Sequence, residues 1–404
     1  MFKNHALIAG AGIGGLAAAL ALARAGWSID VIERSSNLTE VGAGIQLGPN
    51  SMSALKSLGL GPSLDKACYF PKKIKVFNAL NGEILGSLDL ATMKSKYKSP
   101  YCCIHRSDLQ NILFQACSNQ SDNKHQIQSH FNKNISNITQ TEDAVSVEAD
   151  MNSVFEGDVI VGADGLWSTV RQKLLNDGEP KETSHVAYRA LIKQESLPPT
   201  LHTTDITIWL GPKLHLVMYP VRGGEYINVV AIVDAHIKSE PGNWNQEGFS
   251  HDLGNAFSST CSKLKDLLFI IENWRFWSLK TRIPISNSTQ QAQGRVALIG
   301  DAAHPMLPYL AQGAGMAIED AYVLGKCFQN KSISIEMALK NFGEFRWRRN
   351  RQVQLRSRMN GHIFHLTGFA SWIRNQVIRM RGEKILDMPW LYNNGPTSQS
   401  FYEE

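Results

Sequence analysis

A short apolar run, a glycine-rich turn and an alanine-rich stretch follow one another at the start of the chain. Ala6–Ala9 is typical of a buried parallel strand, segment 10–15 of a tight turn, and Leu16–Ala25 of a buried helix. Gly26 predicts the end of that helix, and Ser28–Glu33 predicts a second strand. The order strand, helix, strand is that of a βαβ unit, in which the two strands pair in parallel.

The pattern changes in the middle of the chain. Residues 186–233 carry short alternating runs, such as Thr204–Trp209 and Tyr226–Val230, and Gly-Pro and Gly-Gly pairs punctuate them. This pattern predicts an antiparallel sheet inserted into the fold. Arg295–Gly300 then predicts another buried strand, followed by a loop and a helix from about Gly315 to Phe328.

Composition narrows the class of protein. The 404 residues are 43% apolar and 19% charged, as in ordinary globular proteins, and the chain is long enough for two domains. The net charge of +5 suits anionic cofactors and substrates and is too small to favour nucleic acid. The six cysteines show neither zinc spacing nor a CxxC pair, so we expect reduced thiols and no metal site. Since neither a signal-peptide pattern nor an apolar run of roughly twenty residues is visible, we expect a cytoplasmic protein without an integral membrane segment.

Segment 10–15 carries a dinucleotide-binding fingerprint. Gly10, Gly12 and Gly15 occupy the three glycine positions of GxGxxG. The first permits the tight turn, the second lets the backbone approach a pyrophosphate, and the third lets the helix pack close to its strand. The helix N-terminus offers unpaired N–H groups to the anion, and Glu33 at the end of the second strand can accept hydrogen bonds from ribose hydroxyls. The fingerprint alone fits NAD and FAD equally well.

Three further motifs favour FAD. They are DVIVGADGLWSTVR at 158–171, GDAAHP at 300–305, and QGAG at 312–315 followed by Glu319-Asp320-Ala321. With these motifs in this order, the chain resembles the class A, single-component FAD-dependent aromatic hydroxylases, such as the salicylate, 3-hydroxybenzoate and 6-hydroxynicotinate hydroxylases. The resemblance extends from residue 5 to about residue 360. It implies non-covalently bound FAD, transient binding of NADH or NADPH, and hydroxylation of a small phenolic or benzoate-like substrate with O2 through a flavin C4a-hydroperoxide.

The resemblance also implies roles for single residues. Asp301 is expected to bind the ribityl chain of FAD and Arg106 its pyrophosphate, and Asp164 belongs to a motif implicated in both FAD and NAD(P)H binding. Gly313 and Gly315 let backbone N–H groups face the pyrimidine end of the flavin, where the helix dipole would stabilise the anionic reduced ring by roughly 0.3–2 kcal/mol. The remaining expected cofactor contacts are Arg34, Gln46, Pro305 and Ala314.

A residue that helps to ionise the substrate is expected on the strand Lys213–Pro220. A phenol has a pKa near 10, so forming its phenolate at pH 7 costs about 4 kcal/mol, and electrophilic hydroxylation needs that phenolate. His215 and Tyr219 point to the same face of such a strand, and in the family a similarly placed His and Tyr handle the substrate hydroxyl; a purely structural pair is the alternative. Gln312 matches a family position that hydrogen-bonds a ring substituent. Gln46 stands where the hydroxynicotinate members carry a histidine, and because a carboxamide is not a base at neutral pH, a benzoid substrate is favoured.

The expected fold is therefore of the α/β class. It combines a Rossmann-like FAD-binding domain of the glutathione-reductase type with an inserted antiparallel-sheet substrate domain and C-terminal helices. We assign residues 1–72, 100–178 and 287–330 to the FAD-binding domain, 73–99 and 179–286 to the substrate domain, and 331–404 to the C-terminal helical region. Both a monomer and a homodimer are compatible with the sequence.

Other functions remain open at this stage. A ubiquinone-pathway hydroxylase, or an epoxidising or antibiotic-modifying flavin monooxygenase, would share these motifs. An NAD-dependent dehydrogenase would lack GDAAHP, and a non-enzymatic flavin sensor would keep the fold without turnover. A basic stretch in the C-terminal region is either a solvated helix face or a weak contact with an anionic membrane surface, which would favour the ubiquinone alternative. Its arginines are Arg346, Arg348, Arg349, Arg351, Arg356 and Arg358, interleaved with Trp347, Val353 and Leu355.

Overall fold

The parallel sheet predicted from the first residues is built from strands that lie far apart in the sequence. In the computed structural model, which describes residues 4–38, 43–120, 127–150, 152–235, 246–393 and 395–398, its strand order is β18-β19-β11-β1-β2-β7. All neighbours pair in parallel except β18 and β19. The strands are β1 (His5–Ala9), β2 (Ser28–Ile32), β7 (Ile127–His130), β11 (Val159–Gly162), β18 (Ala292–Gln293) and β19 (Val296–Leu298).

The helix α1 (Ile13–Arg24) is apolar on all sides because it lies between the sheet, α5 (Arg106–Asn119) and α10 (Gly313–Gln329). Leu16 and Leu20 are fully buried, and burying each such side chain contributes about 1.5–3 kcal/mol. The helix begins three residues before the expected Leu16, and α10 likewise begins at its first glycine. Some glycines that the sequence assigned to turns therefore lie in the first turn of a helix, where the backbone N–H groups remain available for a ligand.

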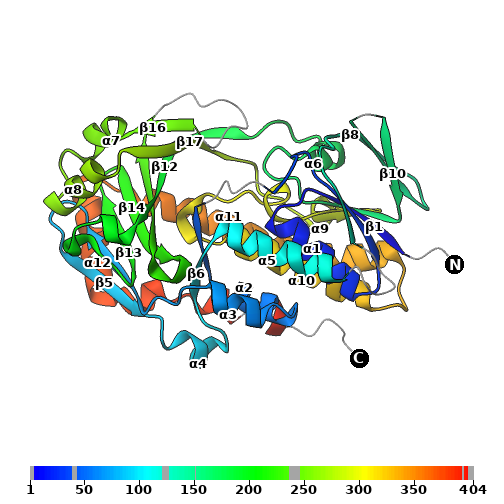
Figure 1. Ribbon diagram of the computed structural model, residues 1–404, viewed down its shortest axis with the longest axis horizontal. Coiled ribbons are helices and arrows are strands. Elements are labelled where there is room, and N and C mark those ends of the chain that lie inside the picture. The colour runs from blue at the N-terminus through cyan, green and yellow to red at the C-terminus, as the bar shows by residue number, and fades with distance from the viewer. Residues whose placement is uncertain are drawn as a thin grey trace.

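The second large sheet has eight strands in the order β16-β17-β12-β15-β14-β13-β4-β5. The two sheets lie toward opposite ends of an elongated molecule (Figure 1). The prediction of an antiparallel sheet is correct for every pair except β13 and β4, which run parallel. The strand β4 arrives in a hairpin with β5 from an earlier part of the chain, so no tight turn fixes its direction against β13. The strands are β4 (Lys73–Asn78), β5 (Ile84–Asp89), β12 (Lys181–Lys193), β13 (Ile206–Gly211), β14 (Leu214–Val221), β15 (Tyr226–Asp234), β16 (Gln246–Phe249) and β17 (Asn273–Thr281).

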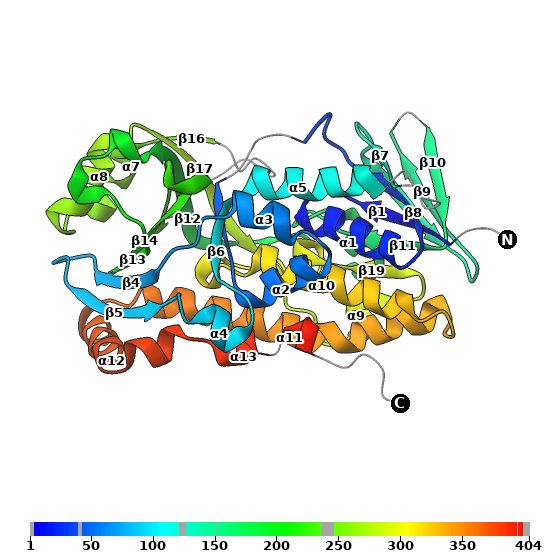
Figure 2. The same cartoon turned by 60° about the horizontal axis from the view of Figure 1, so that its bottom comes forward.

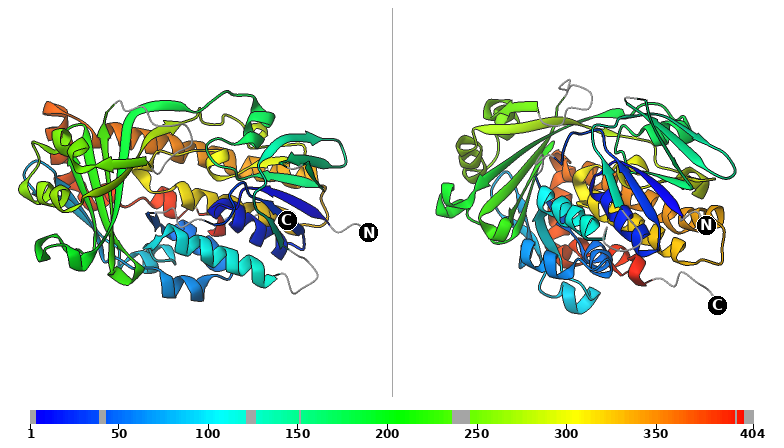
Figure 3. Two further views of the ribbon diagram at one scale, coloured as in Figure 1. Left: turned by 45° about the horizontal axis from the view of Figure 1, so that its top comes forward. Right: turned by 45° about the vertical axis from the view of Figure 1, so that its right-hand side comes forward.

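Smaller elements complete the two halves. An antiparallel three-stranded sheet that was not predicted projects at the end opposite the eight-stranded sheet (Figure 3); its strands are β8 (Ile135–Gln140), β9 (Val145–Ala149) and β10 (Ser153–Gly157). The strands β3 (Gly44–Leu47) and β6 (Cys102–His105) form an antiparallel pair. The short helices are α2 (Pro49–Ser57), α3 (Gly61–Ala67), α4 (Met93–Tyr97), α6 (Thr169–Leu175), α7 (Ser250–Phe257), α8 (Ser262–Ile270), α9 (Ser288–Gln291) and α13 (Pro389–Tyr392). The domain boundaries given above stay a prediction.

The C-terminal region is helical, as expected, with α11 (Ile335–Phe364) and α12 (Gly368–Leu386) lying along one side of the molecule (Figure 2). Four of the six arginines contact other segments of the protein, so the basic stretch is not simply a solvated helix face, while the weak membrane contact stays a prediction. Arg346 is buried in ion pairs with Glu319 and Asp320, and Arg349 also pairs with Glu319. Arg351 and Arg358 donate hydrogen bonds to backbone carbonyls of the segment 282–285, while Arg348 is exposed. Within the described residues, no helix has the length and apolarity needed to cross a membrane.

Candidate active site

A cavity of about 570 Å³ opens where the carboxyl ends of the parallel strands meet the N-termini of α1 and α10. This edge of a doubly wound sheet is where such folds bind nucleotides. Most residues expected to contact the cofactor line it: Gly10, Gly12, Glu33, Arg34, Arg106, Asp164, Asp301, Gly313 and Ala314. The sequence also left several lining residues unassigned, among them Gln110, Lys133, Trp167 and Arg189.

The glycine turn before α1 leaves room for an anion. A Cβ built on Gly12 would meet no atom within 4 Å, whereas one on Gly15 would lie 1.9 Å from the carbonyl oxygen of Gly10. Gly10 itself has a φ of +101°. The first turn of α1 has neither a side-chain cap nor an acidic residue, so its N–H groups and dipole are available to a phosphate. Of the three motif glycines, only Gly12 has open space beside its Cα, which is the space that a pyrophosphate would need.

Glu33 and Gln110 hold this turn in shape. Glu33 accepts hydrogen bonds from the backbone N–H groups of Ala11 (2.7 Å) and Ser35 (2.8 Å), and Gln110 donates to the carbonyl of Ala11 (2.8 Å). Because each carboxylate oxygen has further lone pairs, Glu33 can accept a ribose hydroxyl while it keeps these contacts.

Asp301 lies in the short turn Gly300–Ala302 that follows β19, and its side chain faces the cavity. Desolvation by the surrounding protein raises the pKa of Asp301, and the nearby His304 and Arg106 oppose that rise. Further along the chain α10 begins at Gly313, again without a side-chain cap or an acid in its first turn. A hydroxyl-bearing chain beside Asp301 and an electron-rich ring at the start of α10 both fit these donors and acceptors.

Asp164 lines the cavity, but its carboxylate is occupied mainly within the protein. One oxygen accepts from the Ser168 hydroxyl (2.5 Å), and the other accepts from the backbone N–H groups of Thr169 (2.7 Å) and Val170 (3.2 Å). These bonds cap the start of α6 and fix the loop 165–168 at the cavity wall.

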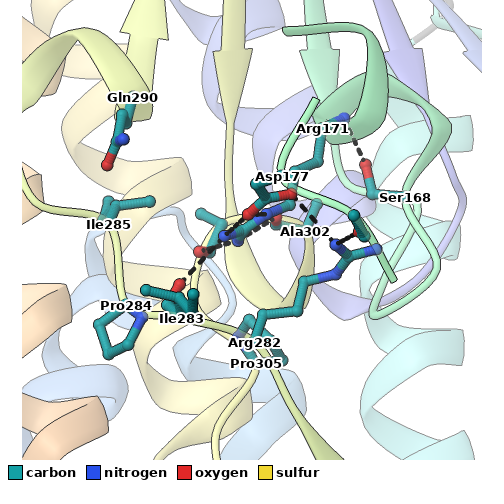
Figure 4. A network of polar contacts seen from close by, with 12 residues as sticks. Ser168, Arg171, Asp177, Arg282, Ile283, Pro284, Ile285, Gln290, Ala302 and Pro305 are labelled. Atoms are coloured by element: carbon teal, nitrogen blue, oxygen red, sulfur yellow. Dashed lines mark hydrogen bonds and ion pairs between the residues drawn. The ribbon is translucent and has the colours of Figure 1, made fainter. Parts of the chain in front are cut away.

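Arg171, the last residue of the motif 158–171, connects this motif to the loop that carries Asp301 (Figure 4). Arg171 is 1% exposed and donates to the carbonyls of Ala302 (3.1 Å) and Ala303 (2.6 Å), directly after Asp301. Asp177 bridges Arg171 and Arg282, at 2.6 and 3.2 Å. The polar end of the DVIVGADGLWSTVR motif therefore positions the GDAAHP loop.

His215 and Tyr219 lie on the same face of β14, as the strand period predicts, but neither lines the described cavity. The Tyr219 hydroxyl donates to the carbonyl of Gly44 (2.6 Å). His215 is 2% exposed, and its Nδ1 lies 2.8 Å from Nε2 of His365. Burial, with His365 and His185 adding to it, lowers the pKa of His215 well below 6.5, while burial raises the pKa of Tyr219 well above 10. Both side chains are thus neutral at pH 7.

The loop between Asp301 and Gly313 connects this pair to the cavity. Tyr309, in the 3-10 turn Pro308–Leu310 of that loop, has its ring centroid 5.3 Å from that of His215. His215 therefore lies directly behind the loop whose two ends line the cavity.

Comparison with known proteins agrees with this geometry. A family model described as FAD binding domain matches residues 3–331. The 3-hydroxybenzoate 6-hydroxylase of Polaromonas naphthalenivorans (strain CJ2) is 35% identical over 390 residues, which is 96% of this chain and 95% of that protein. A second relative, 3-hydroxybenzoate 6-hydroxylase 1 of Aquipseudomonas alcaligenes, is 36% identical over 93% of both chains.

The chain belongs to the class A FAD-dependent aromatic hydroxylases.

Solved structures of other proteins have the same fold as this hydroxylase. Klebsiella pneumoniae HpxO, complexed with FAD and uric acid, has a TM-score of 0.85 at 25% identity and covers 98% of each chain. A salicylate hydroxylase in complex with its substrate has a TM-score of 0.79 at 24% identity and covers 95% of each chain. FAD is therefore the cofactor, the protein is an aromatic monooxygenase, and the dehydrogenase alternative is excluded.

Besides His215 and Tyr219, five further expected site residues of the hydroxylase lie outside the cavity wall. The Gln312 side-chain oxygen accepts from Asn50 (3.1 Å), that of Gln46 accepts from the Tyr101 hydroxyl (2.8 Å), and the Pro305 carbonyl accepts from Gln354 (3.0 Å). Gly15 and Gly315 lie in the first turns of α1 and α10. The sequence did not indicate that His365 and His185 lie beside His215, since nothing in the local pattern relates α11 or β12 to the strand that bears His215.

Proposed function

We propose that this hydroxylase acts on 3-hydroxybenzoate or a close analogue, with NADH or NADPH as reductant and O2 as oxidant, and adds a hydroxyl group para to the phenolic oxygen. The observation that carries the proposal is the similarity over nearly the full length, at 33–36% identity, to three proteins named 3-hydroxybenzoate 6-hydroxylase. The six free cysteines, five of them buried, support a reducing compartment such as the cytoplasm.

The chemistry of the substrate fits the residues around β14. When bound, FAD supplies the reduction and activation of O2. Attack on an aromatic ring by an electrophilic oxygen is directed para by a phenolate, and position 6 is para to the hydroxyl of 3-hydroxybenzoate. We assign proton removal from that hydroxyl to His215, whose imidazole is neutral and whose Nδ1 is engaged by His365. Among the described residues no hydrogen bond occupies Nε2, so Nε2 is the nitrogen left for the phenol.

Tyr219 and Gln312 are assigned positioning roles. The Tyr219 hydroxyl donates its proton to the Gly44 carbonyl and is also hydrogen-bonded by the Gln46 side chain, so its oxygen keeps one lone pair at most with which to accept a bond from the substrate hydroxyl. Gln312 uses its side-chain oxygen on Asn50 and keeps its amide N–H groups for a carboxylate or a phenolate oxygen. With Tyr219 accepting a hydrogen bond on one side and Gln312 donating one on the other, the pair would orient a hydroxybenzoate.

A matched series of ligands tests the assignment. The FAD-loaded protein is mixed with NADH or NADPH and, in turn, 3-hydroxybenzoate, benzoate and 3-methoxybenzoate, and oxidation of the reductant and the aromatic product are measured together. We expect 2,5-dihydroxybenzoate from 3-hydroxybenzoate alone, because the other two ligands cannot form a phenolate. Equal product from 3-methoxybenzoate would contradict a role for substrate ionisation, and no product from 3-hydroxybenzoate would contradict the proposed substrate.

A further inference from the structure

Three histidines and a tyrosine from four separate elements meet behind the substrate strand. His215 is on β14, His185 on β12, His365 directly follows α11, and Tyr309 is in the loop that leads to α10. The ring centroids of His215 and His365 lie 5.1 Å apart, and those of His365 and His185 4.6 Å apart. The three imidazole rings therefore lie next to one another behind β14.

The ring nitrogens form a continuous chain. Nδ1 of His215 lies 2.8 Å from Nε2 of His365, and Nδ1 of His365 lies 3.3 Å from Nε2 of His185. Nδ1 of His185 lies 2.5 Å from the Tyr309 hydroxyl. Burial decreases along the chain: His215 is 2% exposed, His365 9%, and His185 is half-buried. The chain therefore leads from the buried face of β14 toward the surface.

The charges around the chain favour a cation at its outer end. Burial, with the neighbouring His185, Arg374 and His362 adding to it, lowers the pKa of His365 to about 3. The pKa of His185 is also lowered by burial, and His362 contributes, but the Asp234 carboxylate on β15 opposes the shift. Asp234 is exposed and is the acid that faces this cluster. An imidazolium is thus least unfavourable at His185.

We propose that His365 and His185 relay to the surface the proton that His215 takes from the substrate hydroxyl. The proposal rests on the assignment of His215 above. In the starting state each imidazole carries its proton on Nδ1. The phenol proton binds to Nε2 of His215, the Nδ1 proton of His215 passes to Nε2 of His365, and the Nδ1 proton of His365 passes to Nε2 of His185. His185 is then a cation beside Asp234 and loses one proton to solvent, so one proton leaves the substrate and one leaves the protein.

Proton release on ligand binding tests the relay without turnover. Oxidised, FAD-loaded enzyme is mixed with 3-hydroxybenzoate in a weakly buffered solution that contains a pH indicator, and release is followed by stopped flow. We expect His365→Gln and His185→Gln to slow release by on the order of tenfold or more, because glutamine can hydrogen-bond but cannot carry the proton. Ligand affinity and FAD content should change less than about twofold. His362→Gln is the matched control, since His362 is exposed beside the cluster but outside the chain of hydrogen bonds, and it should release protons at the wild-type rate.

Chemical rescue separates a relay from a structural role. Added imidazole should restore fast release to His185→Ala, where the half-buried site is open to solvent, and should not restore it to His365→Ala. Release at the wild-type rate in both His365 and His185 variants, with no release in His215→Asn, would overturn the relay alone. No release from the wild type, or normal release from His215→Asn, would overturn the assignment of His215 and the relay with it.

Discussion

At the scale of single residues, the cofactor site depends on which glycines have open space beside them and which are packed against the backbone. A side chain at Gly12 would extend into open space, while one at Gly15 would collide with the Gly10 carbonyl. We therefore expect Gly12→Val to fold with a melting temperature close to that of the wild-type apoprotein, since bound FAD itself stabilises the fold, and to purify without FAD, because the valine occupies the path of the pyrophosphate. Flavin absorbance relative to protein absorbance gives the occupancy, and circular dichroism gives the fold. A yellow Gly12→Val protein with full occupancy would show that this turn does not hold FAD.

Two substitutions of Asp301 should weaken FAD binding to different extents. Hydrogen bonds to a charged group contribute about 1.5–3 kcal/mol, so Asp301→Ala should raise the dissociation constant for FAD roughly ten- to hundredfold. Asp301→Asn keeps an accepting oxygen and should lose less. The measurement is fluorescence titration of the apoprotein with FAD, and equal affinity in all three proteins would contradict the assignment of Asp301 to the ribityl chain.

The cofactor residues could be predicted because they belong to contiguous motifs. Gly10, Glu33 and Asp301 each stand at a fixed distance from a strand that the apolar pattern reveals. Arg189 and His365 could not be predicted, since each reaches its site only through the pairing of β12 or the end of α11. The position of Gln312 was predicted, but its engagement with Asn50 was not, because Asn50 lies on α2, far away in the sequence.

At the scale of elements, α10 and α11 are held together by a buried ionic cluster. Arg346, which is 1% exposed, lies 2.9 Å from Glu319 and 2.7 Å from Asp320. Burial alone would raise the pKa of both carboxyl groups, but for Glu319 the charges of Arg349 and Arg346, and for Asp320 those of His304 and Arg346, outweigh it and lower both pKa values. The contribution of these carboxylates to stability is therefore complete above their ordinary pKa values of 4.5 and 3.8 and is lost as the pH falls below them.

We expect Arg346→Met to reduce the free energy of unfolding by about 3–5 kcal/mol, because it leaves buried carboxylates short of a partner. Arg348→Met, two residues along the same helix and exposed, should change it by less than about 0.5 kcal/mol. Urea unfolding at about pH 7 and about pH 4 measures both effects. The wild type should lose more stability than Arg346→Met between these two pH values, and an equal loss in the two proteins would contradict the role of the ion pairs.

The helices and strands were easier to predict than the segments with which they pair or pack. The periodicity of residues 186–233 correctly indicated strands, and the stretch after Ile335 correctly indicated helices. The parallel pairing of β13 with β4 escaped prediction because the pairing partner of a strand depends on chain connections rather than on its own pattern. The basic stretch of α11 was misinterpreted for a related reason: its arginines pair with carboxylates and carbonyls from other segments, which the local sequence does not reveal.

At the scale of the whole molecule, the long helix α11 connects the two functions of the enzyme. Near its start it packs on α9 and α10 of the FAD half, and the residue after its last turn, His365, reaches His215 on the eight-stranded sheet. The strand that bears His215 and the loop that follows Asp301 are thus both in contact with α11 or with the residue after it. This arrangement supports a single active site that lies between the two sheets.

The most direct test of this account is to compare the wild type and His215→Ala for the hydroxylated product formed per NAD(P)H oxidised, with 3-hydroxybenzoate under isotopically labelled O2. The account predicts dihydroxybenzoate that carries one labelled oxygen atom from the wild type. His215→Ala should slow hydroxylation by on the order of 10²–10⁴, divert oxidation toward hydrogen peroxide, and keep its FAD. The defect should shrink as the pH approaches the pKa of the phenol, near 10, because solvent then supplies the phenolate. Unlabelled product from the wild type, or full rate and full coupling in His215→Ala at pH 7, would contradict the account.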